Sequence, residues 1–566
     1  MKKNSIVFVC LAFSLSMVAK TPENAPLFTH FTYTGNDEVY MTNPLAADEF
    51  YSPILQGCYP DPSITRKGED YYLVNSSFAF FPGVPIFHSK DLVNWKQTGH
   101  VLDRTSQLKV HDAGISQGIY APDMKYNPHN DTFYMITTQI AGGIGNMVVK
   151  TKDPAGAWSD PVKLDFDGID PSLFFDDDGK AYLVHNDAPE KALYEGHRVI
   201  KLWEYDTEND RVIPGTDKII VDGGVDISQK PIWIEGPHLY KKNGRYYLMC
   251  AEGGTGDWHS EVIFVSDTPK GTYIPAKNNP ILTQRYFPND RKNRVDWAGH
   301  ADLVETPDGK YYGVFLAVRP NEKGRVNTGR ETFLLPVDWT GEFPVFENGL
   351  VPLVPKQKMP AGVENKTGKE GFFPNGNFTF ADNFTTAKLD DRWIGVRGAR
   401  EEFVEITKTG LKIHPYPANI KEAKPTSTLF LRQQHKQFEA TVTIDFKPQS
   451  EKDLAGIVCY QKETFNYVFG VTRKDDAFYL LLERTEAGKS TVLAAEKIDL
   501  RQPVQLKVEA NGDDYQFSYA VAGQAFTNLG GIVSGDILST GVAGGFTGCL
   551  IGLYATSANV HTHPYD

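Results

Sequence analysis

The strongest constraint on the fold is an internal repeat, in which one hairpin pattern occurs five times. Each copy contains a small residue or proline, an apolar strand, a polar turn and a second strand rich in aromatic residues. Gly, Asn and Asp fill the turns and β-branched or aromatic residues flank them, which is the pattern of a β-hairpin. The copies begin at Tyr59, Tyr120, Gly168, Ile234 and Gly299, so they start roughly 50 to 65 residues apart. This period is about the length of one four-stranded propeller blade, and five copies predict five blades.

The whole chain is predicted to be all-β and to contain two domains. Its 566 residues exceed the length of one ordinary domain, and regular helical patterns are scarce. We assign residues 45–354 to a five-bladed β-propeller, with residues 20–44 as an N-terminal lead-in. Residues 355–376 are charged and rich in Gly and Pro, as is typical of a linker. Strands alternate with turns over residues 377–566, which predicts an antiparallel β-sandwich of the jelly-roll type.

The first 19 residues have the pattern of a signal peptide. Lys2 and Lys3 are followed by an apolar run from Ile6 to Ala19, which is too short to span a bilayer. Cleavage after Ala19 would leave an exported protein, which we expect to be periplasmic or secreted. No later segment is apolar and long enough to cross a membrane.

Net charge and cysteine content exclude some partners and chemistries. A formal net charge of -13, without a cluster of Lys and Arg, argues against nucleic acid as a partner. Beyond the signal peptide the cysteines are Cys58, Cys250, Cys459 and Cys549. They are far apart and lack CxxC spacing or neighbouring His residues, so we expect buried thiols rather than a metal site or a disulfide framework.

The repeat also converts sequence register into geometry. In a propeller the first strand of each blade lines the central channel, and one end of every such strand faces a common funnel. When the hairpins are aligned, each copy has an acidic residue at the start of its first strand, or no more than two residues from it. These residues are Asp61, Asp123, Asp170, Glu235 and Asp302. A single Asp before Pro is more often a turn residue, but the repetition favours a shared site at the rim of the channel.

Such a rim has the groups that hydrolysis of a glycosidic bond requires. One carboxylic acid protonates the leaving oxygen and, in the inverting reaction, a carboxylate activates water on the opposite side of the sugar ring. The acid stays protonated near neutrality if burial or a neighbouring carboxylate disfavours its charged form. We therefore predict Asp61 as the base, Glu235 as the acid and Asp170 as the group that raises the pKa of Glu235. Asp123 and Asp302 are predicted to be structural.

Three of these segments, YPDPSI, GIDPSLFFDDDGKAYL and EGPHLYKKNGRYYL, resemble the acidic motifs of glycoside hydrolase family 43. The similarity extends to SFAFFPGVPIFHSKDLVNW, YAPDM, AEGGTG, GHADLV and GRETFLLP, and thus covers about residues 45 to 350. The resemblance implies a five-bladed propeller and an inverting mechanism. It also implies that Asp61 is the general base, Asp170 the pKa modulator and Glu235 the general acid.

The same resemblance assigns residues that would contact the sugar. Arg330, in GRET, would contact sugar hydroxyls and the acidic cluster, and Phe78 would form a wall of the sugar pocket. Tyr120 stands where relatives often have Trp, although it still offers a face for stacking. His300, in GHAD, matches a histidine that in relatives lies at the propeller axis near a cation or water. A structural calcium ion near His300 and a hydrogen-bonded core histidine are the two alternatives here.

Two segments of the C-terminal region, FADNFTTAKLDDRW and GGFTGCLIGLYAT, look like parts of the concanavalin-like sandwich appended to family 43 β-xylosidases. In those proteins a loop of the sandwich reaches the propeller and narrows the pocket. Phe546 is therefore a candidate wall residue, with ordinary packing as the alternative. Independent binding of carbohydrate is the alternative role for the domain as a whole.

These observations predict an inverting exo-glycosidase that removes terminal pentose residues. The first choice is a β-1,4-xylosidase acting on xylo-oligosaccharides, because of the FPG loop and the appended sandwich. An α-L-arabinofuranosidase acting on arabinoxylan or arabinan fragments is the alternative, since the two sugars present similar hydroxyls. No HExxH or comparable ligand spacing occurs, so no cofactor is expected to be required. A noncatalytic glycan-binding propeller is the alternative from another class, and it would not need the pair of Asp61 and Glu235.

Overall fold

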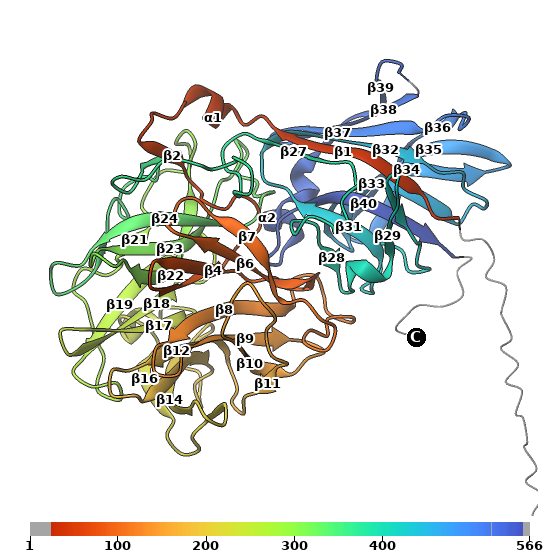
Figure 1. Cartoon of the computed structure of the whole chain (residues 1–566). Coiled ribbons are helices and arrows are strands. Elements are labelled where there is room, and N and C mark those ends of the chain that lie inside the picture. The colour runs from red at the N-terminus through yellow and green to blue at the C-terminus, as the bar shows by residue number, and fades with distance from the viewer. Residues whose placement is uncertain (1–23, 522, 559–566) are drawn as a thin grey trace, which may run out of the picture.

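The computed structural model describes residues 24–521 and 523–558, and it confirms the prediction of an all-β chain (Figure 1). Two bodies of β-structure lie side by side, one formed by the propeller blades and one formed mainly by the C-terminal strands. The signal peptide predicted for residues 1–19 lies outside the described residues. Within the described ranges, no helix is both long and apolar enough to span a membrane.

Five antiparallel sheets of four or five strands form the five blades that the repeat predicts. Blade I contains β3 (Ser63–Lys67), β4 (Asp70–Val74), β6 (Gly83–Ser89) and β7 (Lys96–Leu102). Blade II contains β8 (Gly118–Asn127), β9 (Thr132–Ile140), β10 (Gly145–Thr151) and β11 (Val162–Lys163). Blade III contains β12 (Ile169–Phe175), β13 (Ala181–Asp187), β14 (Val199–Asp206), β15 (Arg211–Val212) and β16 (Lys218–Asp222). Blade IV contains β17 (Glu235–Lys242), β18 (Arg245–Glu252), β19 (Ser260–Ser266), β20 (Ile274–Pro275) and β21 (Leu282–Thr283). Blade V contains β22 (Asp296–Glu305), β23 (Tyr311–Val318), β24 (Glu331–Asp338) and β25 (Val345–Phe346).

The first strands of the blades form a closed ring around the channel. In chain order β3, β8, β12, β17 and β22 each contact the next, and β22 contacts β3. Pairing outside the blades also holds the ends of the propeller together. Leu55 bridges to Thr332 of β24, and β2 (Glu49–Tyr51) pairs with β26 (Lys356–Lys358). The segment predicted as a linker over residues 355–376 therefore begins with a strand that pairs with the start of the propeller.

Two further sheets form the β-sandwich. One contains β29 (Val404–Ile406), β30 (Leu411–Ile413), β1 (Leu27–Gly35), β32 (Gln437–Asp445), β37 (Val504–Asn511), β38 (Asp514–Val521) and β39 (Thr527–Ser534), with β27 (Thr379–Asp382) paired to β1. The other contains β31 (Ser427–Arg432), β40 (Leu550–Ser557), β33 (Asp453–Lys462), β34 (Phe465–Lys474), β35 (Ala477–Glu486) and β36 (Lys489–Ile498). Their inner faces share one apolar core, as stacked sheets do. The remaining elements are short: α1 (Glu38–Thr42), β5 (Phe80–Phe81), η1 (Ile227–Gln229), β28 (Gly395–Val396), η2 (Arg400–Glu402), η3 (Gly535–Leu538) and α2 (Thr540–Ala543).

The position of β1 corrects the prediction of a separate lead-in over residues 20–44. This strand lies between β30 and β32 in the eight-stranded sheet, and Figure 1 shows it in red among the blue strands of the C-terminal domain. Phe28 and Phe31 are fully buried in the sandwich core. Its partners are hundreds of residues away along the chain, so a reading of the local sequence did not reveal the pairing.

Two contacts hold separate segments of the sandwich against the propeller. The short strand β28 pairs with β5 of the propeller. Gly329, just before β24, has a φ of 76°, and a Cβ at that position would lie 2.9 Å from the Cα of Gly548. The two backbones can meet this closely because neither residue has a side chain. As a result the loop that contains Phe546 lies next to Arg330.

The four described cysteines, Cys58, Cys250, Cys459 and Cys549, are buried and free, as expected.

Candidate active site

Each blade has a residue in the left-handed backbone region near the start of its inner strand, and in blades II and V this residue lies three or four residues inside the strand. These residues are Asp61 (φ 51°), Ala121 (φ 26°), Asp170 (φ 54°), Gly236 (φ 54°) and His300 (φ 52°). In blades II to V the pairing with the neighbouring strand shifts register around this residue. Left-handed residues and bulges bend a strand and re-aim its side chains. The repeated bend places the five strand starts around one opening.

The bend separates the predicted rim acids into two layers. Asp61 and Asp170 occupy the bend itself, and Glu235 directly precedes the bend residue Gly236. Asp123 and Asp302 lie two residues further along their strands, deeper in the channel, and do not line the cavity at the opening. Aligning the five hairpins by sequence places each acid only to within a residue or two, and this precision does not separate the two layers.

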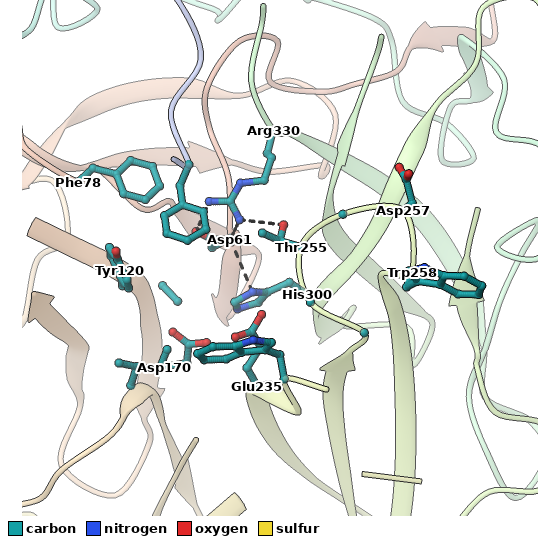
Figure 2. Close-up of a pocket in the computed structure, with 17 residues that line it drawn as sticks. Asp61, Phe78, Tyr120, Asp170, Glu235, Thr255, Asp257, Trp258, His300 and Arg330 are labelled. Atoms are coloured by element: carbon teal, nitrogen blue, oxygen red, sulfur yellow. Dashed lines mark hydrogen bonds and ion pairs between the residues drawn. The ribbon is translucent and has the colours of Figure 1, made fainter. Parts of the chain in front are cut away.

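A cavity of about 600 Å³ opens at this end of the channel. It is lined by all eight residues predicted to be catalytic, substrate-binding or metal-binding: Asp61, Phe78, Tyr120, Asp170, Glu235, His300, Arg330 and Phe546. In Figure 2 the carboxyl groups and Arg330 converge on one space, with Phe78 and Tyr120 at one side of it. The cavity therefore combines residues of all five blades with one residue of the sandwich.

Asp61 is buried among partners that stabilise its charged form. Arg330 Nη1 donates to Oδ1 at 2.9 Å, and the Ser76 hydroxyl donates to Oδ2 at 2.6 Å. His300 Nδ1 lies 3.5 Å from Oδ1. Burial by itself would raise the pKa of Asp61, but the charges and the hydroxyl around it outweigh this effect and lower the pKa below its usual value. Asp61 is therefore a carboxylate that can accept a proton.

Glu235 has the opposite electrostatic environment. Burial, and then the negative charges of Asp170 and Asp61, raise the pKa of Glu235 well above its usual value. Burial and the charge of Asp61 also raise the pKa of Asp170, while the Gly236 N–H, 3.2 Å from Oδ2, favours its charged form. The Gly236 N–H thus offsets part of the shift at Asp170, whereas the two neighbouring carboxylates at Glu235 add to the effect of burial, so we assign the proton of this pair to Glu235. One cavity thus contains a charged base and a protonated acid.

Arg330 connects the carboxylates to the aromatic wall. Its Nη1 also donates to the Thr255 hydroxyl at 3.3 Å, and its guanidinium carbon lies 5.9 Å from the ring centre of Phe78 and 5.5 Å from that of Phe546. Its Nε is buried and has no hydrogen-bond partner among the described residues. A buried donor without a partner is costly, and a hydroxyl of a bound polar molecule would satisfy it.

Three aromatic rings form one wall of the cavity. Phe78 and Phe546 lie nearly parallel, with ring centres 6.5 Å apart, and Tyr120 lies edge-on to Phe546 at 5.8 Å. The backbone N–H of Phe546 donates to the Ser116 hydroxyl at 2.9 Å, and the Tyr120 hydroxyl donates to the Ser116 carbonyl at 2.8 Å. Ser116 therefore fixes the sandwich loop and the propeller wall to each other.

The sequence analysis missed one face of the cavity. Trp233 lies two residues before Glu235 and lines the cavity, as do Thr255, Asp257 and Trp258 of the glycine-rich loop after β18. Loops at the same end of other blades carry predicted site residues, so their position relative to the repeat was the signal that could have identified them. The AEGGTG segment contributed only to the family resemblance.

The deeper layer contains a candidate metal site. Among the described residues, Asp123, His238 and Asp302 form a cluster whose ligand atoms lie within 4.8 Å of one another. Lys125 already places its ammonium 2.7 Å from Asp302 Oδ2 and 3.2 Å from Asp123 Oδ1. Calcium prefers six to eight oxygen ligands, whereas this cluster contains an imidazole and a resident cation. These donors therefore do not suit calcium, and His300, near which a structural calcium ion was one of two alternatives, is not part of this cluster.

Comparisons with known proteins cover both domains. The family described as "Glycosyl hydrolases family 43" matches residues 50–344, and "Beta xylosidase C-terminal Concanavalin A-like domain" matches residues 381–566. The chain is 38% identical to a xylosidase/arabinosidase of Butyrivibrio fibrisolvens, over 89% of this chain and 95% of the relative. It is 33% identical to the non-reducing end alpha-L-arabinofuranosidase BoGH43B of Bacteroides ovatus, over 93% of this chain and 96% of the relative.

Solved structures are similar over the same extent. A GH43_12 retrieved from a capybara gut metagenome has 60% identity and a TM-score of 0.91, and the match covers 94% of this chain and 100% of that one. A xylan beta-1,4-xylosidase from Bacillus halodurans C-125 has 29% identity and a TM-score of 0.81, with 90% of this chain and 97% of that one covered. The two-domain arrangement described above is thus shared with these structures.

Proposed function

Because the chain belongs to glycoside hydrolase family 43, we propose that it is an inverting exo-glycosidase that removes single pentose residues, with β-1,4-linked xylo-oligosaccharides as the preferred substrates. The observation that carries this proposal is the pairing of a charged Asp61 with a protonated Glu235 in one cavity. Hydrolysis with inversion needs these two protonation states at the same time.

In this mechanism Glu235 donates one proton and Asp61 accepts one. Glu235 donates its proton to the glycosidic oxygen as the bond from that oxygen to the anomeric carbon breaks. Asp61 accepts a proton from a water molecule whose oxygen forms the new bond to the anomeric carbon. The negative charge of Asp170 is one cause of the raised pKa of Glu235, after burial. Proton transfer among these groups requires no cofactor.

The shape of the cavity supports exo action. Phe78, Tyr120 and Phe546 close one side, so a chain of sugars cannot continue in that direction. Aromatic faces suit the C–H groups of a sugar ring, while Arg330 and the carboxyls suit its hydroxyls. A terminal sugar bound against this wall has its glycosidic bond directed toward the open side.

The choice of the terminal sugar is tested by comparing two chromogenic substrates. Nitrophenyl β-xyloside and nitrophenyl α-L-arabinofuranoside are hydrolysed side by side, and kcat/KM is measured for each. We expect the xyloside to be preferred, and a strong arabinoside preference would overturn this choice. The arabinofuranosidase remains the second candidate because BoGH43B, which is named for that activity, is 33% identical over most of both chains.

Export to the periplasm or the medium is part of the same proposal. The basic start and apolar run of residues 1–19 support it, and so does a substrate that derives from an extracellular polysaccharide. Sequencing the N-terminus of the protein from the host's extracellular or periplasmic fraction tests it. A mature N-terminus near residue 20 is expected.

A further inference from the structure

A second cavity adjoins the catalytic cavity on its open side. Its volume is about 330 Å³, and it shares Asp257 and Trp258 with the catalytic cavity. Its other walls come from the segment between β21 and β22, including Arg285 and Phe287, and from Asp296 and Trp297 at the start of β22. The two spaces are therefore neighbours separated by a single loop, which follows β18.

Trp258 lies on this boundary with its side chain exposed. The residue is 70% exposed, the highest value among the large exposed hydrophobic residues of the described chain. Polar contacts hold its loop in place: Arg285 Nη1 donates to the Trp258 carbonyl at 3.3 Å, and Trp297 Nε1 donates to Asp257 Oδ1 at 2.7 Å. An indole held at the surface beside a cavity, with polar groups at its edge, is typical of a binding site.

The chemistry of this surface suits an uncharged polyhydroxyl ligand, because Arg285 lines the second cavity together with the carboxylates of Asp257 and Asp296 and neither sign of charge prevails. The described hydrogen-bond partners of Arg285 are neutral, namely the Trp258 carbonyl and the hydroxyls of Ser260 and Tyr286. Its Nε is buried without a hydrogen-bond partner among the described residues. Asp257 adds an acceptor, so the surface has donors and acceptors as well as two aromatic rings. We call Asp257, Trp258, Arg285 and Phe287 the Trp258 surface.

The position of the general acid sets the direction in which a substrate extends. The acid protonates the leaving oxygen, so the leaving part of the substrate lies on the acid's side of the site. Glu235 pairs in register with Ala251 of β18, and Trp258 lies in the loop that leaves this same strand. Figure 2 shows Trp258 on the side of the site away from Phe78 and Tyr120. A leaving sugar that departs from Glu235 over blade IV therefore meets the Trp258 surface.

We propose that the Trp258 surface binds the leaving-group saccharide of a neutral oligosaccharide, with a sugar ring stacked on the indole of Trp258. This inference rests on the proposed function and names a determinant of substrate length within it. Binding energy from sugars beyond the cleaved bond then contributes to the transition state. The enzyme accordingly favours substrates with a saccharide leaving group over those without one.

The test compares a substrate without a leaving sugar to one with two. The pentosyl fluoride of the preferred sugar loses a single atom, whereas the linear trisaccharide loses a disaccharide. The measured quantity is the ratio of kcat/KM for the trisaccharide to kcat/KM for the fluoride. We expect Trp258→Ala to lower this ratio about tenfold, as loss of a central Trp contact does, and Trp258→Phe to give an intermediate ratio.

The matched control is Leu193→Ala, which removes another exposed apolar side chain, 65% exposed, on a blade III loop that does not line either cavity. It should leave the ratio unchanged. If the wild type hydrolyses the fluoride but Trp258→Ala keeps the wild-type ratio, the inference is overturned and the proposed function stands. If the wild type hydrolyses neither substrate, the proposed function fails and the inference fails with it.

Discussion

Arg330 Nη1 lies 2.9 Å from Oδ1 of Asp61, although 269 residues separate the two along the chain. This ion pair joins the first blade to the last one at the mouth of the channel. Both side chains are buried, so solvent screens their interaction little. The pair explains how a buried carboxylate stays charged beside two other carboxyl groups.

Replacing Arg330 with Gln should change the protonation of the base, Asp61. Without the cation, burial dominates and the pKa of Asp61 rises. Because the base acts only when deprotonated, the acid limb of the pH profile of kcat/KM should move to higher pH. Arg330→Lys keeps the charge and should move this limb less, although it loses the fork geometry. Equal shifts in both variants would contradict the electrostatic role of Arg330.

Glu235→Gln should remove the proton donor while keeping the shape of the side chain. We expect kcat for an oligosaccharide to fall by roughly 10²- to 10⁴-fold, the usual contribution of a general acid. The loss should be much smaller for a pentosyl fluoride, whose leaving group needs little protonation. Steady-state kinetics on both substrates measures this difference. An equal fall in kcat for the oligosaccharide and the fluoride would argue against Glu235 as the acid.

Asp170→Asn should change the protonation of Glu235. The negative charge of Asp170 raises the pKa of Glu235, so its removal lowers that pKa. The acid acts only when protonated, and the basic limb of the kcat/KM profile should therefore move to lower pH. Asp187→Asn, in the same blade but outside the cavity, is the control and should leave the limb in place. A basic limb that stays fixed in Asp170→Asn would exclude this role.

Lys125→Met should destabilise the propeller. It removes the ammonium that lies between two buried carboxylates, Asp123 and Asp302, and loss of one partner from a buried pair costs about 3–5 kcal/mol. Thermal unfolding should show a clear fall in Tm. The control Lys67→Met breaks an exposed pair with Asp131, which solvent screens, so its Tm should change little. Similar Tm values for the two variants would contradict the structural role of the deeper cluster.

Phe546→Ala should weaken substrate binding with little effect on stability. The ring is 36% exposed and contributes to the wall of the cavity from the second domain. We expect KM to rise by about tenfold, corresponding to about 1.4 kcal/mol of lost contact, with Tm nearly unchanged. A large fall in Tm instead would assign Phe546 to the domain interface and not to the sugar.

Much of the site could be predicted from the repeat because a propeller brings equivalent positions together. Asp61, Asp170 and Glu235 lie 50 or more residues apart, yet the hairpin pattern places each at the start of an inner strand. The pattern could not show that the bend falls at Asp170 but one residue after Glu235. Such a difference depends on backbone angles, to which residue type is only a weak guide.

The sequence by itself determined the number of blades, the start of each inner strand and the acids near those starts, because these follow from local periodicity and turn chemistry. Tertiary structure alone decided which acids line the cavity, that Lys125 occupies the deeper layer and that β1 completes the C-terminal sheet. It also decided that Trp258 lies at the boundary of two cavities. These outcomes depend on contacts between segments distant along the chain, which local sequence patterns do not encode.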